Sequence, residues 1–307
     1  ATDGSSLLYY NRTDGRFYRI TADGQVELLS ERVFFNVSSV SWAPDRAQAV
    51  LEYPDGSNIL YNFDTERAAT LPQHWQKFNF SPDSSALAFL SLGLDEDSRW
   101  LAIANPDGSG AKPIEPLGKN ADKVQVAWSP GGQIVGFSKT GSPQGLNEQE
   151  ILFIGANKEN FRSLVVNGIN FRGKWSPDGA RLLYSTVSGT DGWRPAVWIA
   201  DAKPSSIGQN KTALGLNTFA DKCSFGSATT IYCAVPTALE EGAGLYPQIA
   251  ATTPDHLYRV DLQTGERELI AIPQGDHTIE SIVVTKDGKT LFFTDKISGQ
   301  LYKINLQ

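Results

Sequence analysis

The sequence has no methionine, only two cysteines and three histidines, and no apolar run near the ~18 residues needed to span a bilayer. It also lacks an excess of positive charge, because 27 Lys and Arg stand against 34 Asp and Glu, a formal net charge of −7. This balance argues against a nucleic-acid partner. Since the chain begins at Ala1 and holds no initiator methionine, we expect an upstream segment, such as a membrane anchor or another domain.

Several catalytic signatures are missing as well. There is no Gly-x-Ser-x-Gly nucleophile elbow, and the glycine-rich stretch at residues 189–192 lacks the lysine and helix of a phosphate loop. The only histidines are His74, His256 and His277, too few and too scattered to indicate a metal site. We therefore expect no metal and no cofactor. Paired carboxylates are common, but glycosidase chemistry depends on their separation in space.

What the sequence does contain is a repeat. Seven times, at a period of about 40–50 residues, a tight turn is followed by two apolar strands, which is the pattern of a β-propeller blade. The clearest copies are Trp175–Gly179 followed by Leu182–Tyr184, and Phe80–Asp83 followed by Leu87–Phe89. The turns of the seven copies fall at Thr2, Pro44, Pro82, Pro130, Pro177, Phe225 and Lys286.

Each copy reads as four strands, a to d, and the first strand often ends in an aromatic residue, as at Trp42, Phe80, Trp128 and Trp175. We interpret these aromatics as packing between blades rather than as a ligand cage. The sequence predicts an all-β fold, a seven-bladed β-propeller of four-stranded antiparallel blades forming a single domain over residues 1–307. Strand a of the first blade and strand d of the last are missing. The predicted blades cover residues 1–30, 38–72, 75–117, 123–166, 170–214, 219–272 and 279–307.

The turn motif and the strand after it resemble the repeats of TolB-like propellers, also called WD40-like or PD40 repeats. The resemblance covers nearly the whole chain and is strong at Pro44, Pro82, Pro130 and Pro177. It weakens in the sixth copy, at residues 224–226, and in the seventh, at residues 285–288. It implies a propeller that binds proteins, as most of this family do, although some accompany peptidase or glycan-degrading machinery.

The b–c loops differ between copies. They are short in copies one, two and seven, and long in four consecutive copies, at residues 91–99, 139–150, 186–195 and 235–255. The long loops hold nine acidic residues, Asp255 among them, against three basic ones. Function gathers on variable loops of a rigid scaffold, although acidic loops also serve solubility alone. The predicted binding face comprises Asp95, Glu96, Asp97, Glu148, Glu150, Asp191, Trp193, Glu240, Glu241, Tyr246, His74 and His277.

The two cysteines flank the weak sixth turn. A hairpin centred on Ala228 sets Cys223 opposite Cys233 on neighbouring antiparallel strands, within disulfide reach. The alternative is a pair of buried free thiols. A disulfide indicates an oxidising compartment, so we expect a periplasmic, extracellular or cell-surface protein, which a missing N-terminal segment could anchor to a membrane.

From these observations we expect a non-enzymatic, extracytoplasmic binding or scaffolding module. Its partner would be another protein or a cell-envelope component that meets the b–c loops through cationic or polar groups. We expect no nucleic acid and no membrane insertion by this segment. Two alternatives stay open: a propeller enzyme that acts on a glycan or peptide through rim carboxylates and His74 or His277, and a purely structural domain of a larger envelope protein.

Overall fold

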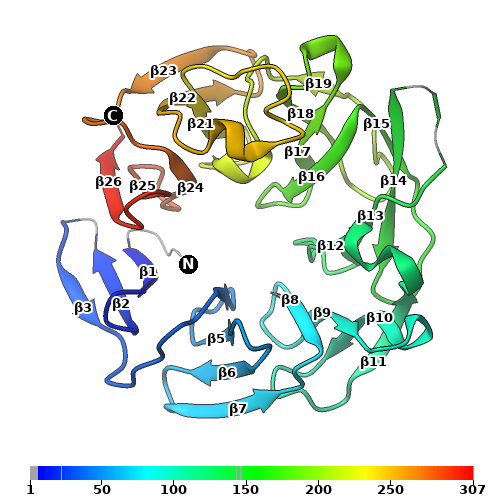
Figure 1. Cartoon of the computed structure of the whole chain (residues 1–307), viewed down its shortest axis with the longest axis vertical. Helices are drawn as coiled ribbons and strands as arrows, with labels where there is room; N and C mark the ends of the chain where they lie inside the picture. The colour runs from blue at the N-terminus through cyan, green and yellow to red at the C-terminus, as the bar shows by residue number, and fades with distance from the viewer. Residues whose placement is uncertain (1–5, 22, 143, 146, 307) are drawn as a thin grey trace. The chain divides into compact units, whose positions relative to one another are not determined.

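The chain folds into seven antiparallel β-sheets, the blades of a seven-bladed β-propeller (Figure 1). The computed structural model describes residues 6–21, 23–142, 144–145 and 147–306. Blades two to six have four strands each, and the first and last have three, as the sequence predicts. The turn expected at Thr2 lies outside the described residues. None of the short helices within the described ranges has the length and apolar character needed to cross a bilayer.

The chain divides into two compact units. The first holds residues 6–140 and 153–161, and the second holds mainly residues 141–152 and 162–307. The first three blades belong to the first unit. Their strands are β1 (Ser6–Asn11), β2 (Arg16–Thr21), β3 (Val26–Leu28), β4 (Ser39–Trp42), β5 (Gln48–Glu52), β6 (Asn58–Asn62), β7 (Arg67–Leu71), β8 (Trp75–Phe80), β9 (Leu87–Leu92), β10 (Arg99–Ala104) and β11 (Lys112–Pro116).

The fourth blade consists of β12 (Val124–Val126), β13 (Ile134–Ser138), β14 (Glu148–Gly155) and β15 (Leu164–Asn167). The last three blades belong to the second unit. Their strands are β16 (Ile169–Trp175), β17 (Arg181–Val187), β18 (Pro195–Asp201), β19 (Thr212–Ala213), β20 (Cys223–Phe225), β21 (Thr230–Pro236), β22 (Asp255–Asp261), β23 (Arg267–Ala271), β24 (Ile279–Val284), β25 (Thr290–Asp295) and β26 (Leu301–Asn305).

Aromatic side chains pack neighbouring blades together in the first unit. The ring of Phe17, on β2 of blade one, is fully buried. Its centroid lies 5.5 Å from that of Trp42 and 5.1 Å from that of Phe63, both contributed by blade two. Edge-to-face pairs of this kind stabilise a core beyond the area they bury. The repeated aromatic at the end of strand a therefore fills the space between blades here.

The Ser-Pro-Asp turn is held by a recurring set of hydrogen bonds. The hydroxyl of Ser81 donates to Asp83 Oδ1 over 2.6 Å and accepts the backbone N–H of Ala86. Thr285 and Asp287 make the same two kinds of bond in the seventh copy, with the hydroxyl accepting the N–H of Thr290. The seventh turn, which looks degenerate as a motif, thus keeps the hydrogen bonds that close its hairpin.

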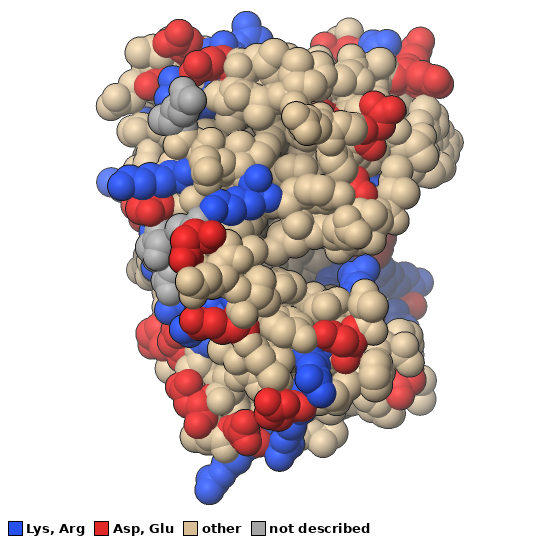
Figure 2. Space-filling view, turned by 90° about the vertical axis from the view of Figure 1, so that its left-hand side faces the viewer, with Lys and Arg blue, Asp and Glu red and all other residues tan. Residues whose placement is uncertain are grey.

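Charges of both signs are mixed on the face shown in Figure 2, where Lys and Arg side chains lie among Asp and Glu side chains. A mixed surface of this kind favours solubility without a single-sign patch.

Candidate functional site

The b–c loops differ in length in the structure, but those of blades three and five exceed the short loops by less than the sequence indicates. The connection between strands b and c covers residues 12–15, 53–57 and 296–300 in blades one, two and seven. It covers residues 93–98, 139–147, 188–194 and 237–254 in blades three to six. The last of these also contains a short 3-10 helix, η5 (Pro247–Ala250).

In the first unit, Asp95, Glu96 and Asp97 lie exposed at and beside the 3-10 turn η1 (Glu96–Ser98). Arg99 stabilises the loop by donating from Nε to the carbonyl of residue 93. His74 is exposed, and its backbone carbonyl accepts the N–H of Leu92 at the base of the same loop. The structure thus places these three acids and His74 at one blade.

Glu148 and Glu150 lie on β14 and behave differently from each other. Glu148 is exposed. Glu150 is half-buried and accepts hydrogen bonds from the hydroxyl of Ser163, over 2.6 Å, and from the N–H of Ser142, over 3.0 Å. Glu150 therefore holds its own loop in place.

The loops of blades five and six are joined to each other. The N–H of Gly242 donates to the carbonyl of Gly192 over 2.9 Å, and the N–H of Gly244 donates to the carbonyl of Trp193 over 2.8 Å. Arg194 adds a bond from Nε to the Leu239 carbonyl. These three bonds fasten the long loop of blade six to its neighbour and give both a fixed conformation.

We call the outer side of these two loops the joined loop surface. Tyr246 is 58% exposed and Ile249 41% exposed. Trp193 is half-buried, with a positive φ of 55° and its ring against Gly189, so much of its contact area is used within the protein. The surface consists of Asp191, Trp193, Glu240, Glu241, Tyr246 and Ile249, and its three acidic residues are exposed.

Asp255 does not belong to the acidic rim, contrary to the sequence-based expectation. It is the first residue of β22, and its side chain is shielded from solvent. Both carboxylate oxygens lie 2.6 Å from Nζ of Lys222, and Oδ2 also accepts the N–H of Ile279. Burial raises the pKa of Asp255 and lowers the pKa of Lys222, because each loses hydration of its charged form.

His277 is packed into the second unit. Its Nδ1 lies 3.4 Å from Asp295 Oδ1, its Nε2 lies 3.0 Å from the Gln274 carbonyl, and its ring centroid is 4.4 Å from that of Tyr302. Both ring nitrogens therefore face acceptors within the protein. Among the residues that the structure describes, no group of three or more His, Cys, Asp or Glu side chains is arranged to hold a metal ion.

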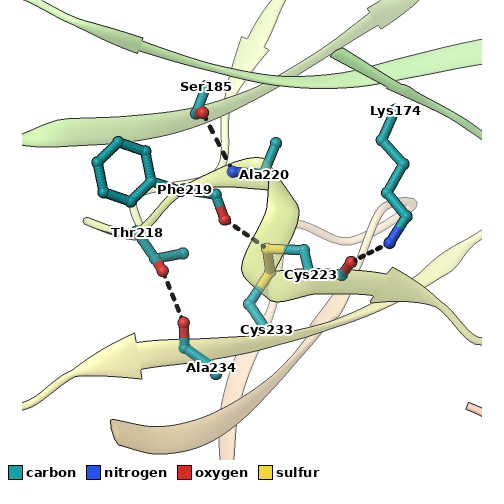
Figure 3. Close-up of a disulfide and its surroundings, with 8 residues drawn as sticks. All are labelled: Lys174, Ser185, Thr218, Phe219, Ala220, Cys223, Cys233 and Ala234. Carbon is teal, nitrogen blue, oxygen red and sulfur yellow. Dashed lines mark hydrogen bonds between the residues drawn. A yellow bond between two sulfur atoms is a disulfide. The ribbon is translucent and has the colours of Figure 1, made fainter. Parts of the chain in front are cut away.

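The predicted disulfide is confirmed (Figure 3). Cys223 on β20 pairs with Cys233 on β21, with their Cα atoms 4.1 Å apart and both side chains buried. The surroundings in Figure 3 are tightly bonded: Lys174 Nζ donates to the Cys223 carbonyl and Thr218 Oγ1 to the Ala234 carbonyl, each over 2.6 Å. The bridge closes the hairpin whose turn has lost the Ser-Pro-Asp bonds.

Sequence reasoning missed two features of this region. One is the burial of Asp255 by Lys222, which depends on a contact between distant segments and leaves no local signal. The other is the role of Gly242 and Gly244 in joining the loops. A Cβ at Gly244 would lie 2.6 Å from Val187 Cγ1. Two glycines separated by one residue are a usable signal for such close backbone approach.

The protein is a seven-bladed β-propeller whose b–c loops differ in length from blade to blade. No protein-family model matches the sequence, and no curated protein matches it. Among solved structures, the chain is similar to an oligogalacturonate lyase in complex with manganese, at 16% identity and a TM-score of 0.64, covering 99% of this chain and 86% of that one.

Two further structures are similar. TolB from Acinetobacter baumannii matches at 14% identity and a TM-score of 0.55, over 87% of this chain and 63% of that one. The β-propeller domain of the Trilobed protease from Pyrococcus furiosus matches at 13% identity and a TM-score of 0.60, over 100% and 94%. Likeness at these identities shows the shared propeller fold.

Proposed function

We propose that the protein is a non-enzymatic, extracytoplasmic binding or scaffolding module, and that the joined loop surface contacts another protein or a cell-envelope component. The observation that carries the proposal is the set of three hydrogen bonds that fixes the loops of blades five and six to each other. A surface held in one conformation loses little entropy on binding. Exposed Tyr246 and Ile249 supply apolar contact area on this surface.

The exposed carboxylates of this surface favour a partner of opposite charge. Asp191, Glu240 and Glu241 are exposed and form no ion pair within the described residues. A partner that presents Lys or Arg side chains beside an apolar patch would pair with these carboxylates, and opposite charges would also speed association. We therefore propose a basic partner surface.

The extracytoplasmic assignment is supported by the disulfide, because buried structural disulfides are rare in reducing compartments. The fold it shares with TolB is consistent with this location. The test is to fractionate the native cells, block free thiols, and measure the intact mass of the protein from each fraction. A bridged protein in the periplasmic or surface fraction supports the assignment, and a reduced protein in the cytosol refutes it.

The non-enzymatic assignment is supported by the state of the groups that an enzyme would use. Asp255, the buried carboxylate whose pKa is raised, is occupied by Lys222 and an N–H donor. His277 faces Asp295 and the Gln274 carbonyl. We expect no product when the protein is incubated with oligogalacturonate, the substrate named for one similar structure, or with a peptide library. Turnover that purifies with the protein would overturn this part of the proposal.

The binding surface is tested by site-specific photo-crosslinking in native cells from Tyr246, with Leu269 on β23, which is 45% exposed, as the control position. A partner captured from Tyr246 alone is then purified and its Kd measured. The double variant Glu240→Lys and Glu241→Lys should weaken binding by about tenfold or more. The matched variant Glu266→Lys and Glu280→Lys makes the same charge change on exposed residues elsewhere. Equal effects of the two variants would refute the assignment.

A further inference from the structure

A cavity lies in the first unit, beside the short b–c loops of blades one and two. Its volume is about 550 Å³, which is within the range of small-molecule sites. The b–c loop of blade one supplies Arg12, the b–c loop of blade two supplies Tyr53 and Asp55, and the segment between β3 and β4 supplies Phe35 and Asn36. No part of the proposed joined loop surface contributes to it.

The walls of this cavity are turns that are already hydrogen-bonded. In blade one, the N–H of Gly15 donates to the Asn11 carbonyl over 2.9 Å. In blade two, the N–H of Gly56 donates to the Tyr53 carbonyl over 3.0 Å, and Asp55 Oδ1 accepts the N–H of Ser57. A ligand would therefore meet a preformed site.

Phe34 and Phe35 are adjacent in the segment between β3 and β4, and they differ in burial. Phe34 is buried, with its ring 4.9 Å from that of Tyr61, and its N–H donates to the Gly15 carbonyl over 2.7 Å. This anchoring turns the next side chain outward, and Phe35 is 62% exposed. Phe35 therefore presents an exposed aromatic ring in the lining of the cavity, and an apolar ligand group can pack against it.

Three polar groups of the cavity have no hydrogen-bond partner among the residues that the structure describes. The Arg12 guanidinium is exposed and forms no ion pair or hydrogen bond among the described residues. Within the ranges that the structure describes, the hydroxyl of half-buried Tyr53 and the side-chain amide of exposed Asn36 also form no hydrogen bond. These groups offer hydrogen-bond donors in the same lining as the Phe35 ring.

We propose that this cavity binds a singly charged carboxylate attached to a bulky apolar group. Arg12 would bind the carboxylate, whose two oxygens match the fork of a guanidinium. Phe35 would pack against the apolar group, and Tyr53 would donate to a carboxylate or carbonyl oxygen. Asp55 also lines the cavity. Its carboxylate, whose pKa is lowered by hydrogen bonds from Ser57, would repel a doubly charged phosphate or sulfate more strongly than a single carboxylate.

The same chemistry occurs in a free aromatic acid and at the C-terminus of a peptide that ends in a large apolar residue. Isothermal titration with N-acetyl-phenylalanine, with its neutral amide, and with the peptide Ala-Ala-Phe bearing a free carboxylate covers both sources. We expect the two acids to bind and the amide to bind at least tenfold more weakly. Tighter binding of the peptide than of the acetylated amino acid supports the site and identifies a chain terminus as the natural ligand.

The variant Arg12→Gln should weaken binding of both acids about tenfold or more, since a hydrogen bond to a charged group is lost. Phe35→Ser should weaken all three probes. Both side chains are exposed, so the melting temperature should be unchanged. Arg67→Gln, at an exposed arginine that starts β7, is the matched control and should leave the Kd unaltered. Equal affinity for acid and amide, no binding of either acid, or an unchanged Kd in Arg12→Gln would overturn the proposal.

Discussion

Lys222 and Asp255 form a buried ion pair in which Nζ lies 2.6 Å from both carboxylate oxygens. The Asp255 carboxylate also accepts the N–H of Ile279. One side chain therefore connects β22 with the segment before β20 and with the first residue of β24, which belongs to the next blade. This relationship makes the pair a structural link within the second unit.

Removing one partner of this ion pair should lower the free energy of unfolding substantially. Lys222→Met leaves the Asp255 carboxylate buried without its counter-charge, and we expect a loss of about 3–5 kcal/mol in the free energy of unfolding. The further change Asp255→Asn should recover part of that loss. The control is Arg259→Met in the pair Arg259–Glu268, which has the same 2.6 Å separation but is about half exposed. There we expect at most about 1 kcal/mol. Equal losses in urea denaturation would contradict the assignment of a buried link.

The disulfide should stabilise the sixth blade to a moderate degree. The bridge joins residues ten apart in sequence, and closing so short a loop lowers the entropy of the unfolded chain by an amount worth about 2–3 kcal/mol. Replacing both Cys223 and Cys233 with alanine should reduce the unfolding free energy by that amount in guanidinium denaturation. Because both side chains are buried, reductant should cleave the disulfide of the native protein no faster than the protein unfolds. Rapid reduction under native conditions would contradict the burial.

The Ser-Pro-Asp turn should make stability depend on pH in the acid range. Hydrogen bonds from the Ser81 hydroxyl, and from the hydroxyl and N–H of Ser85, lower the pKa of Asp83 from 3.8 to about 2. Since the folded pKa lies below the unfolded one, this stabilisation is present above pH 3.8 and is lost as the pH falls toward 2. Asp83→Asn should flatten the fall of melting temperature across that window. Asp122→Asn, at an exposed residue without a hydrogen bond among the described residues, is the control, and an identical flattening there would count against the turn.

The junction between the loops of blades five and six should depend on the absence of a side chain at Gly244. A Cβ there would lie 2.6 Å from Val187 Cγ1 and 2.7 Å from the Trp193 carbonyl oxygen. Gly244→Ala should cost about 1–3 kcal/mol and increase hydrogen exchange in residues 188–194 and 237–254. Gly131→Ala, where a Cβ meets open space, is the control. Unchanged exchange in both loops would show that the junction tolerates the methyl group.

Most of the fold could be predicted from the sequence because each blade repeats the same local chemistry. The spacing of Ser81 and Asp83, and of Cys223 and Cys233, encodes bonds between residues close along the chain. The burial of Asp255 could not be predicted in this way. It is decided by Lys222 and Ile279, which are far away in sequence and meet it only after folding.

The candidate site was predictable in part for the same reason. Loop lengths and acidic residues are visible in the sequence, but the fastening of Gly242 to Gly192 is a contact between two blades. No feature of the sequence indicated the cavity beside Arg12, because its loops are short and carry no acidic cluster. Its neighbouring phenylalanines differ only in burial, which depends on the ring of Tyr61.

The single pair of cysteines has a consequence for how the protein is made. Within residues 1–307, Cys223 and Cys233 allow one intramolecular bridge, so oxidation of this segment offers no wrong pairing that an isomerase would have to correct. Contact between residues about ten positions apart is reached in roughly 10–100 ns, long before distant segments meet. The disulfide can therefore form as soon as the hairpin forms. Reduced, denatured protein should regain it on oxidation without passing through species with other disulfide pairings.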